Sequence, residues 1–182
     1  MKQSPMKTVA AIGIGTALFF LLGRFVAIPS PVPGTNICLQ YGLLGFMPIL
    51  YGPPAGALIG LIGHFLIDLS WGYGIWWSWV LCSAVFGFLT GLSGRWIPLA
   101  EGDFNGRETV VFNLVQAVVH GICWVGIAPA LDIFLYAEPA NKVFLQGLAG
   151  SAANIVTTAI VGTLFCLAYT TAKPRKRSRK EE

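Results

Sequence analysis

A short stretch in the first half of the chain carries the residues with the clearest chemical potential. His64 and Asp68 are four positions apart, so a helix would place their imidazole and carboxylate on one face. Five large aromatic residues follow within nine positions: Trp71, Tyr73, Trp76, Trp77 and Trp79. Planar rings offer contact area and stacking, and the two polar groups can orient a bound molecule, so the pattern predicts a small-molecule pocket. It equally suits an aromatic belt at a membrane surface beside a hydrogen-bonded pair.

A second polar group flanks a proline-rich segment. Arg24 precedes the charge-free segment 27–35, and Asn36 and Gln40 follow it. Proline fixes φ and stiffens the chain, so this segment could fold over a binding site as a lid or form a tight external turn. The residues alone favour neither interpretation.

A third polar group lies in the second half of the chain. Asn113, Gln116 and His120 follow one another at i, i+3 and i+7, which places them on one helical face. Gln146 and Asn154 lie in the last apolar segment. Amides in membrane bundles commonly hydrogen bond between helices, so we expect this group to link two helices.

The composition indicates that the elements carrying these residues lie in lipid. The chain has 182 residues, of which 55% are hydrophobic and only 11% charged, whereas about 25% are charged in soluble domains. Its mean hydropathy is +0.69. Asp, Glu, Lys and Arg do not occur in 8–23, 25–67, 69–94, 109–131 or 143–172.

These charge-free stretches predict an all-α, polytopic membrane protein. A membrane helix needs roughly 20 apolar residues, and the prolines and glycines within 25–67 divide that stretch into two helices. The prediction is a single bundle of about six transmembrane helices over residues 1–172, followed by a basic tail at 173–182. The expected spans are 8–27, 35–51, 54–70, 75–95, 109–131 and 143–170.

The distribution of basic residues predicts the orientation. With six spans, ten of the 12 lysines and arginines fall on the side of both termini, and only Arg24 and Lys142 fall opposite. Because positively charged flanks stay in the cytoplasm, both termini are expected there, with the first span retained rather than cleaved. A basic tail beside a membrane helix favours contact with anionic lipid, so no nucleic-acid partner is expected.

Several classes of chemistry lack their sequence signatures. No Gly-Lys dipeptide occurs, so the chain has no Walker A motif and we expect no ATP site of its own. No Gly-x-Ser-x-Gly or HExxH motif is present, and the four cysteines fall singly in different predicted spans. We therefore expect no catalytic residues, no metal site and no cofactor in this chain. A membrane enzyme and a structural or assembly protein stay open as alternatives.

The chain resembles the substrate-binding S components of energy-coupling-factor (ECF) vitamin transporters over nearly its whole length. The resemblance is carried by Gly13–Val26, by the proline-rich segment Ile28–Pro33 and by Gly63–Trp79. It implies a multi-pass protein of the bacterial plasma membrane that captures a vitamin outside. The implied partners are an EcfT-like membrane coupling subunit and two cytoplasmic ATPases, which would supply the ATP chemistry.

The resemblance also implies which residues bind. Substrate would lie in the outer half under the loop joining the first two helices, contacted by Arg24, Asn36, Gln40 and the His64–Trp79 group. Small residues four apart in the first helix would contact the coupling subunit, in the register Ala11/Gly15 or Gly13/Ala17. The branch it resembles predicts a cobalt-corrinoid such as cobalamin, while other B vitamins and thiazole or methionine precursors stay open.

Overall fold

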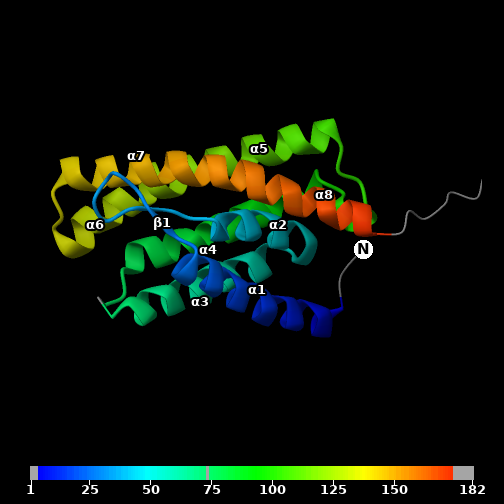
Figure 1. The fold of residues 1–182 in the computed structure, drawn as a ribbon, viewed down its shortest axis with the longest axis horizontal. Coiled ribbons are helices and arrows are strands. Elements are labelled where there is room, and N and C mark those ends of the chain that lie inside the picture. Colours follow the sequence, from blue (N-terminus) through cyan, green and yellow to red (C-terminus); the bar gives the residue numbers. More distant parts are fainter. Residues whose placement is uncertain (1–3, 73, 174–182) are drawn as a thin grey trace, which may run out of the picture.

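The protein folds as a bundle of helices that run side by side along one long axis (Figure 1). The computed structural model describes residues 4–72 and 74–173, so Tyr73 and the predicted tail beyond Lys173 lie outside the described residues. The first four helices are α1 (Pro5–Phe25), α2 (Gln40–Tyr51), α3 (Pro53–Trp71) and α4 (Trp77–Leu92). Two short strands, β1 (Ile28–Pro29) and β2 (Asn36–Ile37), lie between α1 and α2.

The second half of the chain forms two long continuous helices, each with a π-helical segment inside it. The first consists of α5 (Gly106–His120), the segment η3 (Gly121–Ile127) and α6 (Ala128–Tyr136). The second consists of α7 (Ala140–Thr157), the segment η4 (Thr158–Gly162) and α8 (Thr163–Ala172). Two 3₁₀ turns, Ser93–Arg95 and Leu99–Glu101, lie in the connection between α4 and α5.

Local signals in the sequence begin and end these helices. The side chain of Ser4 accepts a hydrogen bond from the backbone N–H of Lys7 and so caps α1, with Pro5 at the first helical position. Asn105 and Glu108 form a capping box at the start of α5. Gly52, with φ of 90°, ends α2 and allows the chain to turn directly into α3.

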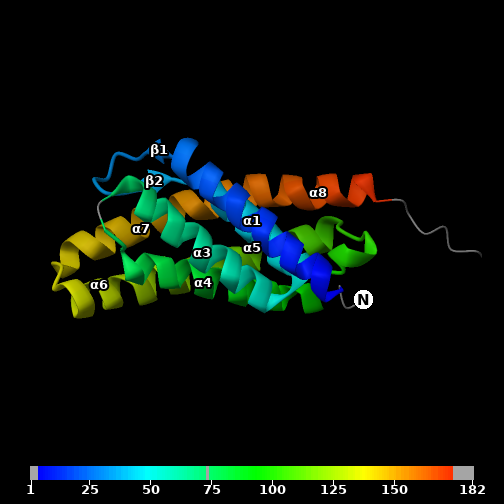
Figure 2. The ribbon, with the colours of Figure 1, turned by 90° about the horizontal axis from the view of Figure 1, so that it is seen from below.

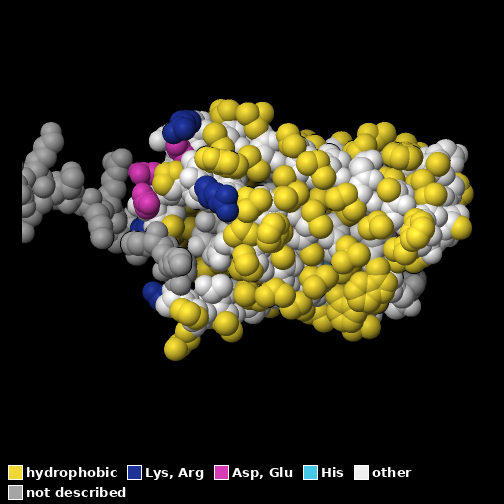
Figure 3. Space-filling model, turned by 180° about the vertical axis from the view of Figure 1, so that it is seen from behind, with side chains coloured by type: hydrophobic (Ala, Val, Ile, Leu, Met, Phe, Trp, Pro, Cys, Tyr) yellow, Lys and Arg dark blue, Asp and Glu magenta, His cyan; other side chains and the backbone are white. Residues whose placement is uncertain are grey.

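The surface and helix lengths confirm a membrane protein. Among the described residues, five helices are long and apolar enough to cross a membrane. Apolar side chains cover most of the face in Figure 3, and the charged side chains gather at one end. Large hydrophobic residues point outward along the helices, including Ile14, Val118 and Ile160, each with about 60% of its surface exposed. Such exposure is unfavourable in water and expected in lipid.

The expected second span is the one that the structure corrects. Helix α2 has only 12 residues, which corresponds to about 18 Å and is shorter than the roughly 30 Å hydrocarbon core. Residues 35–39, expected to be helical, instead contain strand β2 and lead into α2. A short helix preceded by non-helical backbone is tolerated here because α2 is surrounded by protein, with ten of its residues buried. The other five spans are confirmed with shifted ends.

The start of α1 and the end of α8 lie at the same end of the bundle, in agreement with an even number of passes (Figures 1 and 2). The β1–β2 connection and the junction of α6 with α7 lie at the opposite end. Basic-residue counting predicts that this opposite end faces outward, and we call it the outer end.

The third polar group links the two long helices, as predicted. Asn113 donates to Thr163 Oγ1 (3.2 Å), and His120 Nε2 lies 3.1 Å from Thr158 Oγ1. Gln116 donates to the carbonyl oxygen of Ile155. Gln146 and Asn154 were the expected hydrogen-bond partners, but they lie toward the outer end, where both line a cavity.

Candidate functional site

The outer end contains a cavity of about 670 Å³. Its walls come from α1, α2, α3, α4 and α7, and the β1–β2 connection contributes the remaining side. This volume falls within the ~300–1,000 Å³ typical of small-molecule sites.

Most residues predicted to bind a ligand line this cavity. The structure brings together Asn36, Gln40, His64, Asp68, Trp71, Trp76 and Trp79. They come from segments separated by up to a quarter of the chain, so the predicted first and second groups form one cavity lining. The direct role of each residue in binding stays a prediction. Tyr73 lies outside the described residues.

A chain of polar contacts runs through the wall formed by α2, α3 and α4. His64 Nε2 lies 3.6 Å from Asp68 Oδ1, which confirms that the two share a face of α3. His64 Nδ1 lies 2.6 Å from Ser83 Oγ, and the hydroxyl of Tyr41 lies 3.0 Å from the same oxygen. Ser83 was not predicted, because a single serine in an apolar helix gives no signal of which helices will meet it.

Asp68 also closes the turn between α3 and α4. Its Oδ2 accepts a hydrogen bond from the backbone N–H of Trp76 (2.9 Å), the N-cap residue that directly precedes α4. The side chain of Trp76 makes no capping hydrogen bond to α4. The carboxylate of Asp68 therefore supplies an acceptor at the positive, N-terminal end of this helix. The carboxylate therefore holds the aromatic segment against the cavity.

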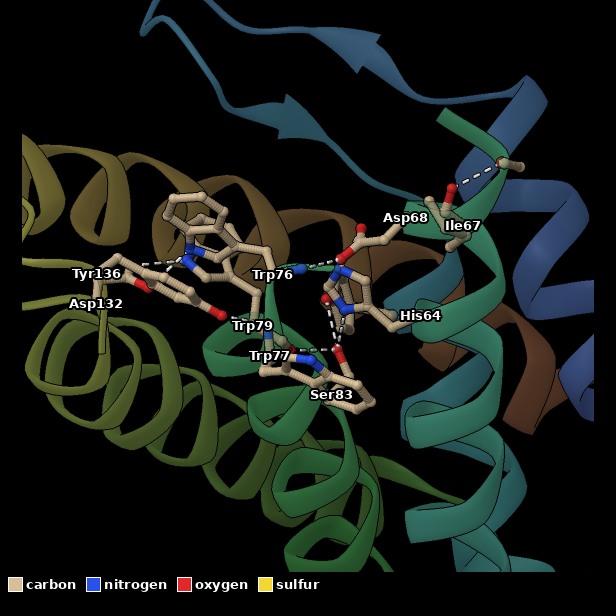
Figure 4. Close-up of polar contacts among 11 residues, drawn as sticks. His64, Ile67, Asp68, Trp76, Trp77, Trp79, Ser83, Asp132 and Tyr136 are labelled. Atoms are coloured by element: carbon tan, nitrogen blue, oxygen red, sulfur yellow. Dashed lines mark hydrogen bonds and ion pairs between the residues drawn. The ribbon is translucent and has the colours of Figure 1, made fainter. Parts of the chain in front are cut away.

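The indole groups are held from behind by α6. Asp132 Oδ1 accepts from Trp76 Nε1 (2.8 Å), and Asp132 Oδ2 accepts from Trp79 Nε1 (3.0 Å). The ring of Trp76 stacks on Tyr136 with centroids 4.3 Å apart. Figure 4 shows Trp76 between Asp132 and Tyr136 on one side and Asp68 and His64 on the other. The only sequence signal for Asp132 was an acidic residue directly after a charge-free stretch.

The proline-rich connection covers the cavity rather than forming a remote turn. Strands β1 and β2 pair antiparallel, with Ile28 opposite Ile37, and several residues between them line the cavity. Gln146 Nε2 donates to the carbonyl oxygen of Pro33 (2.8 Å), and Thr157 Oγ1 donates to that of Cys38 (2.9 Å). Two hydrogen bonds from α7 therefore fasten the cover, which supports the lid interpretation.

Two predicted residues do not line the cavity. The guanidinium of Arg24 lies 4.0 Å from the ring centroid of Trp71, a cation–π contact beside the cavity. Trp77 is 46% exposed, and its ring lies 5.9 Å from that of Phe65. Trp77 therefore fits the interfacial belt, whereas Trp76 and Trp79 face the cavity. The two interpretations of the aromatic cluster apply to different members of it.

Charged and reactive groups are sparse around the cavity. Asp68 and Lys142 line it, and Lys142 Nζ is paired with Glu138 Oε2 at 2.7 Å. In the connection outside the helices, burial raises the pKa of the Cys38 thiol to about 11, with Gln40 partly opposing the shift. Among the described residues no group of three or more potential metal ligands is present.

The small residues of α1 divide between its two faces. Ala11 and Gly15 are buried, and a Cβ on Gly15 would lie 2.7 Å from Ile59 Cδ1 of α3. Gly13 and Ala17 are exposed, and a Cβ on Gly13 would meet no atom within 4 Å. The first pair therefore serves packing within the chain, and the second is free to contact another protein.

Fold and site define a class: a multi-pass helical membrane protein with a covered, ligand-sized cavity at its outer end. Comparison with known proteins gives the family. The model of the ECF-type riboflavin transporter S component matches residues 3–171, and the chain belongs to this family. It is therefore a membrane-embedded transport subunit of the non-catalytic, S-component type.

Relatives of similar length support this assignment. A protein named "UPF0397 protein" from Enterococcus faecalis is 45% identical over 177 residues, covering 97% of each chain. Proteins of the same name from Clostridium perfringens and Staphylococcus aureus are each 44% identical. The former alignment covers 100% of both chains, and the latter covers 97% of this chain and 96% of the relative. No solved structure matches the chain.

Proposed function

We propose that this chain is the substrate-capture subunit of an ATP-driven ECF-type importer. It binds a vitamin-type molecule in the outer cavity and delivers it inward together with an EcfT-like coupling subunit and two ATPases. The observation that carries this proposal is the cavity itself, which is lined by aromatic rings, amide groups and a carboxylate and has a cover fastened to α7. Family membership supports the proposal that this chain binds the substrate while separate subunits hydrolyse ATP.

The cavity supports a ligand with a planar ring system of flavin size. Trp76 and Trp79 line the cavity and provide aromatic surface for a planar ligand, and about 670 Å³ suits a drug-sized molecule. Riboflavin, the ligand named in the description of the family model, fits this description. A corrinoid, the sequence-based prediction, is several times bulkier and would enter with only part of its surface. We therefore rank riboflavin ahead of cobalamin, which is the principal competitor in the test.

The exposed pair Gly13 and Ala17 supports the contact with the coupling subunit. Small residues four apart let a partner helix approach closely in a membrane. Ala11 is buried, and Gly15 packs against Ile59 of α3 and Met47 of α2, so we assign docking to the Gly13/Ala17 register.

The test is native mass spectrometry of the detergent-purified chain, expressed in cells supplied with a mixture of vitamins. We expect one unmodified vitamin to co-purify and to be lost from the variant Trp79→Ala. Trp96→Ala is the matched control, because Trp96 is 60% exposed in the connection at the opposite end and lies away from the cavity. Recovery of a chemically altered molecule would instead indicate an enzyme. Partner proteins that co-purify without any vitamin would indicate an assembly protein.

A further inference from the structure

Asp132 is a buried carboxylate without a cationic partner. Only 2% of its surface is exposed, and neither of the ion pairs among the described residues includes it. A buried charge in a membrane protein is unfavourable unless hydrogen bonds satisfy it, and such residues commonly have functional roles. Asp132 does not line the cavity, so any role in binding must act through other residues.

Three donors satisfy this carboxylate, and all come from the first turn of α4 or the residue before it. Trp76 Nε1 donates to Oδ1 at 2.8 Å, the hydroxyl of Ser78 donates to the same oxygen, and Trp79 Nε1 donates to Oδ2 at 3.0 Å. Asp132 is the acceptor in all three contacts. Trp76 and Trp79 both line the cavity, so Asp132 lies directly behind its aromatic wall.

Tyr136 extends the same support one helical turn further along α6. Its ring stacks on Trp76, and its hydroxyl oxygen accepts the backbone N–H of Trp77 at 2.9 Å. Asp132 and Tyr136 are four residues apart and therefore share a face of α6. This face contacts the indole rings and the backbone of the aromatic segment together (Figure 4).

We propose that Asp132 is a positioning residue for ligand recognition, whose carboxylate fixes the orientations of the Trp76 and Trp79 rings. An indole without a partner for its N–H can rotate about two side-chain bonds, whereas a hydrogen bond to a fixed acceptor selects one orientation. A cavity wall that is already set for a planar ligand loses less conformational entropy on binding. The inference rests on the proposed function, because it assumes that the ligand contacts this wall.

The first arm of the test needs no ligand. The chain contains six tryptophans, and ¹⁵N labelling of their indole groups gives one N–H signal for each in detergent. We expect two signals, assigned to Trp76 and Trp79 by Trp→Phe replacement, to shift and to exchange faster with solvent in Asp132→Asn. Thr158→Val is the matched control, since it removes a buried interhelical contact to His120, and neither residue lines the cavity. Unchanged Trp76 and Trp79 signals in Asp132→Asn would overturn the proposal.

The second arm measures binding of riboflavin and of cyanocobalamin by calorimetry to four chains: wild type, Asp132→Asn, Trp79→Phe and the double variant. Asparagine keeps one oxygen for Trp76 and Ser78 but directs an amide N–H toward the Trp79 N–H. We expect affinity about tenfold lower in Asp132→Asn, because two donors then oppose each other. Trp79→Phe removes one of these donors, so the double variant should bind no more weakly than Trp79→Phe alone.

The outcomes separate the two proposals. Wild-type affinity in Asp132→Asn, or losses that multiply in the double variant, would show that Asp132 does not act through Trp79. If neither vitamin binds the wild-type chain, the proposed ligand is wrong, and the indole signals alone decide whether Asp132 positions the wall. Thr158→Val should lower thermal stability without changing affinity, which distinguishes positioning from general support of the fold.

Discussion

The inner and outer parts of the α3–α4 contact are held together by different forces. Toward the inner end, glycines bring the two backbones into contact: a Cβ on Gly56 would lie 2.2 Å from the carbonyl oxygen of Gly87, and the reverse distance to Gly56 is also 2.2 Å. Toward the outer end polar side chains join them: His64 Nδ1 lies 2.6 Å from Ser83 Oγ, and Asp68 Oδ2 accepts a hydrogen bond from the backbone N–H of Trp76. Close packing is replaced by directional contacts beside the cavity.

Gly60 marks the transition between these two parts. A Cβ there would lie 2.2 Å from the carbonyl oxygen of Ser83, so only glycine lets α4 approach at this level. The same approach brings the hydroxyl of Ser83 to His64 and Tyr41. The comparison teaches that inner substitutions should act on stability, whereas outer substitutions should act on binding. The predictions below test this division, beginning with the largest expected effect.

Gly56→Leu should prevent the bundle from folding normally. The added side chain would overlap the backbone of Gly87, which cannot move without separating α3 from α4. We expect a loss of about 3 kcal/mol or more in the free energy of unfolding. Thermal unfolding followed by size-exclusion chromatography in detergent measures it. A variant as stable as the wild type would contradict the close backbone contact on which the comparison depends.

Gly13→Leu should leave the bundle intact and weaken its binding to the coupling subunit. The new side chain enters open space on the exposed face of α1, so thermal stability should stay within about 0.5 kcal/mol of the wild type. Co-purification with the coupling subunit should fall at least about tenfold, because a large residue blocks close helix approach. Gly126→Leu is a control with equally open surroundings on another helix. Equal recovery of the complex from both variants would exclude docking through Gly13.

Gln146→Ala should loosen the cover of the cavity. The variant loses the hydrogen bond to the carbonyl oxygen of Pro33, and one neutral hydrogen bond contributes about 1 kcal/mol. We expect the ligand to dissociate a few times faster, measured by stopped-flow fluorescence, with little change in thermal stability. Thr109→Ala removes an exposed hydrogen bond to the carbonyl oxygen of Asn105, neither of which lines the cavity, and should leave the rate unchanged. Equal rates in all three proteins would show that the cover does not control release.

Cys38 should report on the cavity without affecting stability. Because burial raises the pKa of its thiol from 9.0 to about 11, little thiolate is present at neutral pH. The rate of maleimide labelling should therefore rise about tenfold per pH unit up to pH 10, where an ordinary thiol would already level off. Bound ligand should slow the labelling, because Cys38 lines the cavity. Cys38→Ser should abolish labelling, since the other three cysteines are buried.

Local patterns predicted the parts of this protein that depend on neighbouring residues. The pairing of His64 with Asp68 follows from helical periodicity, and charge-free stretches identified the helices. The predicted length of the second helix was wrong, because hydropathy does not distinguish a buried extended segment from a buried helix. The docking register was equally undecided, since Gly13 and Gly15 differ only in which face α3 covers.

The sequence by itself determined that the chain lies in lipid, that it forms about six helical segments, and that an aromatic cluster follows a polar helix end. Composition and short-range periodicity carry that information. Only the tertiary structure decided that Asp132 meets Trp76, 56 positions away, and that Gln146 fastens a loop 113 positions earlier. Such contacts depend on how the helices pack against one another, and no spacing along the chain records which faces will meet.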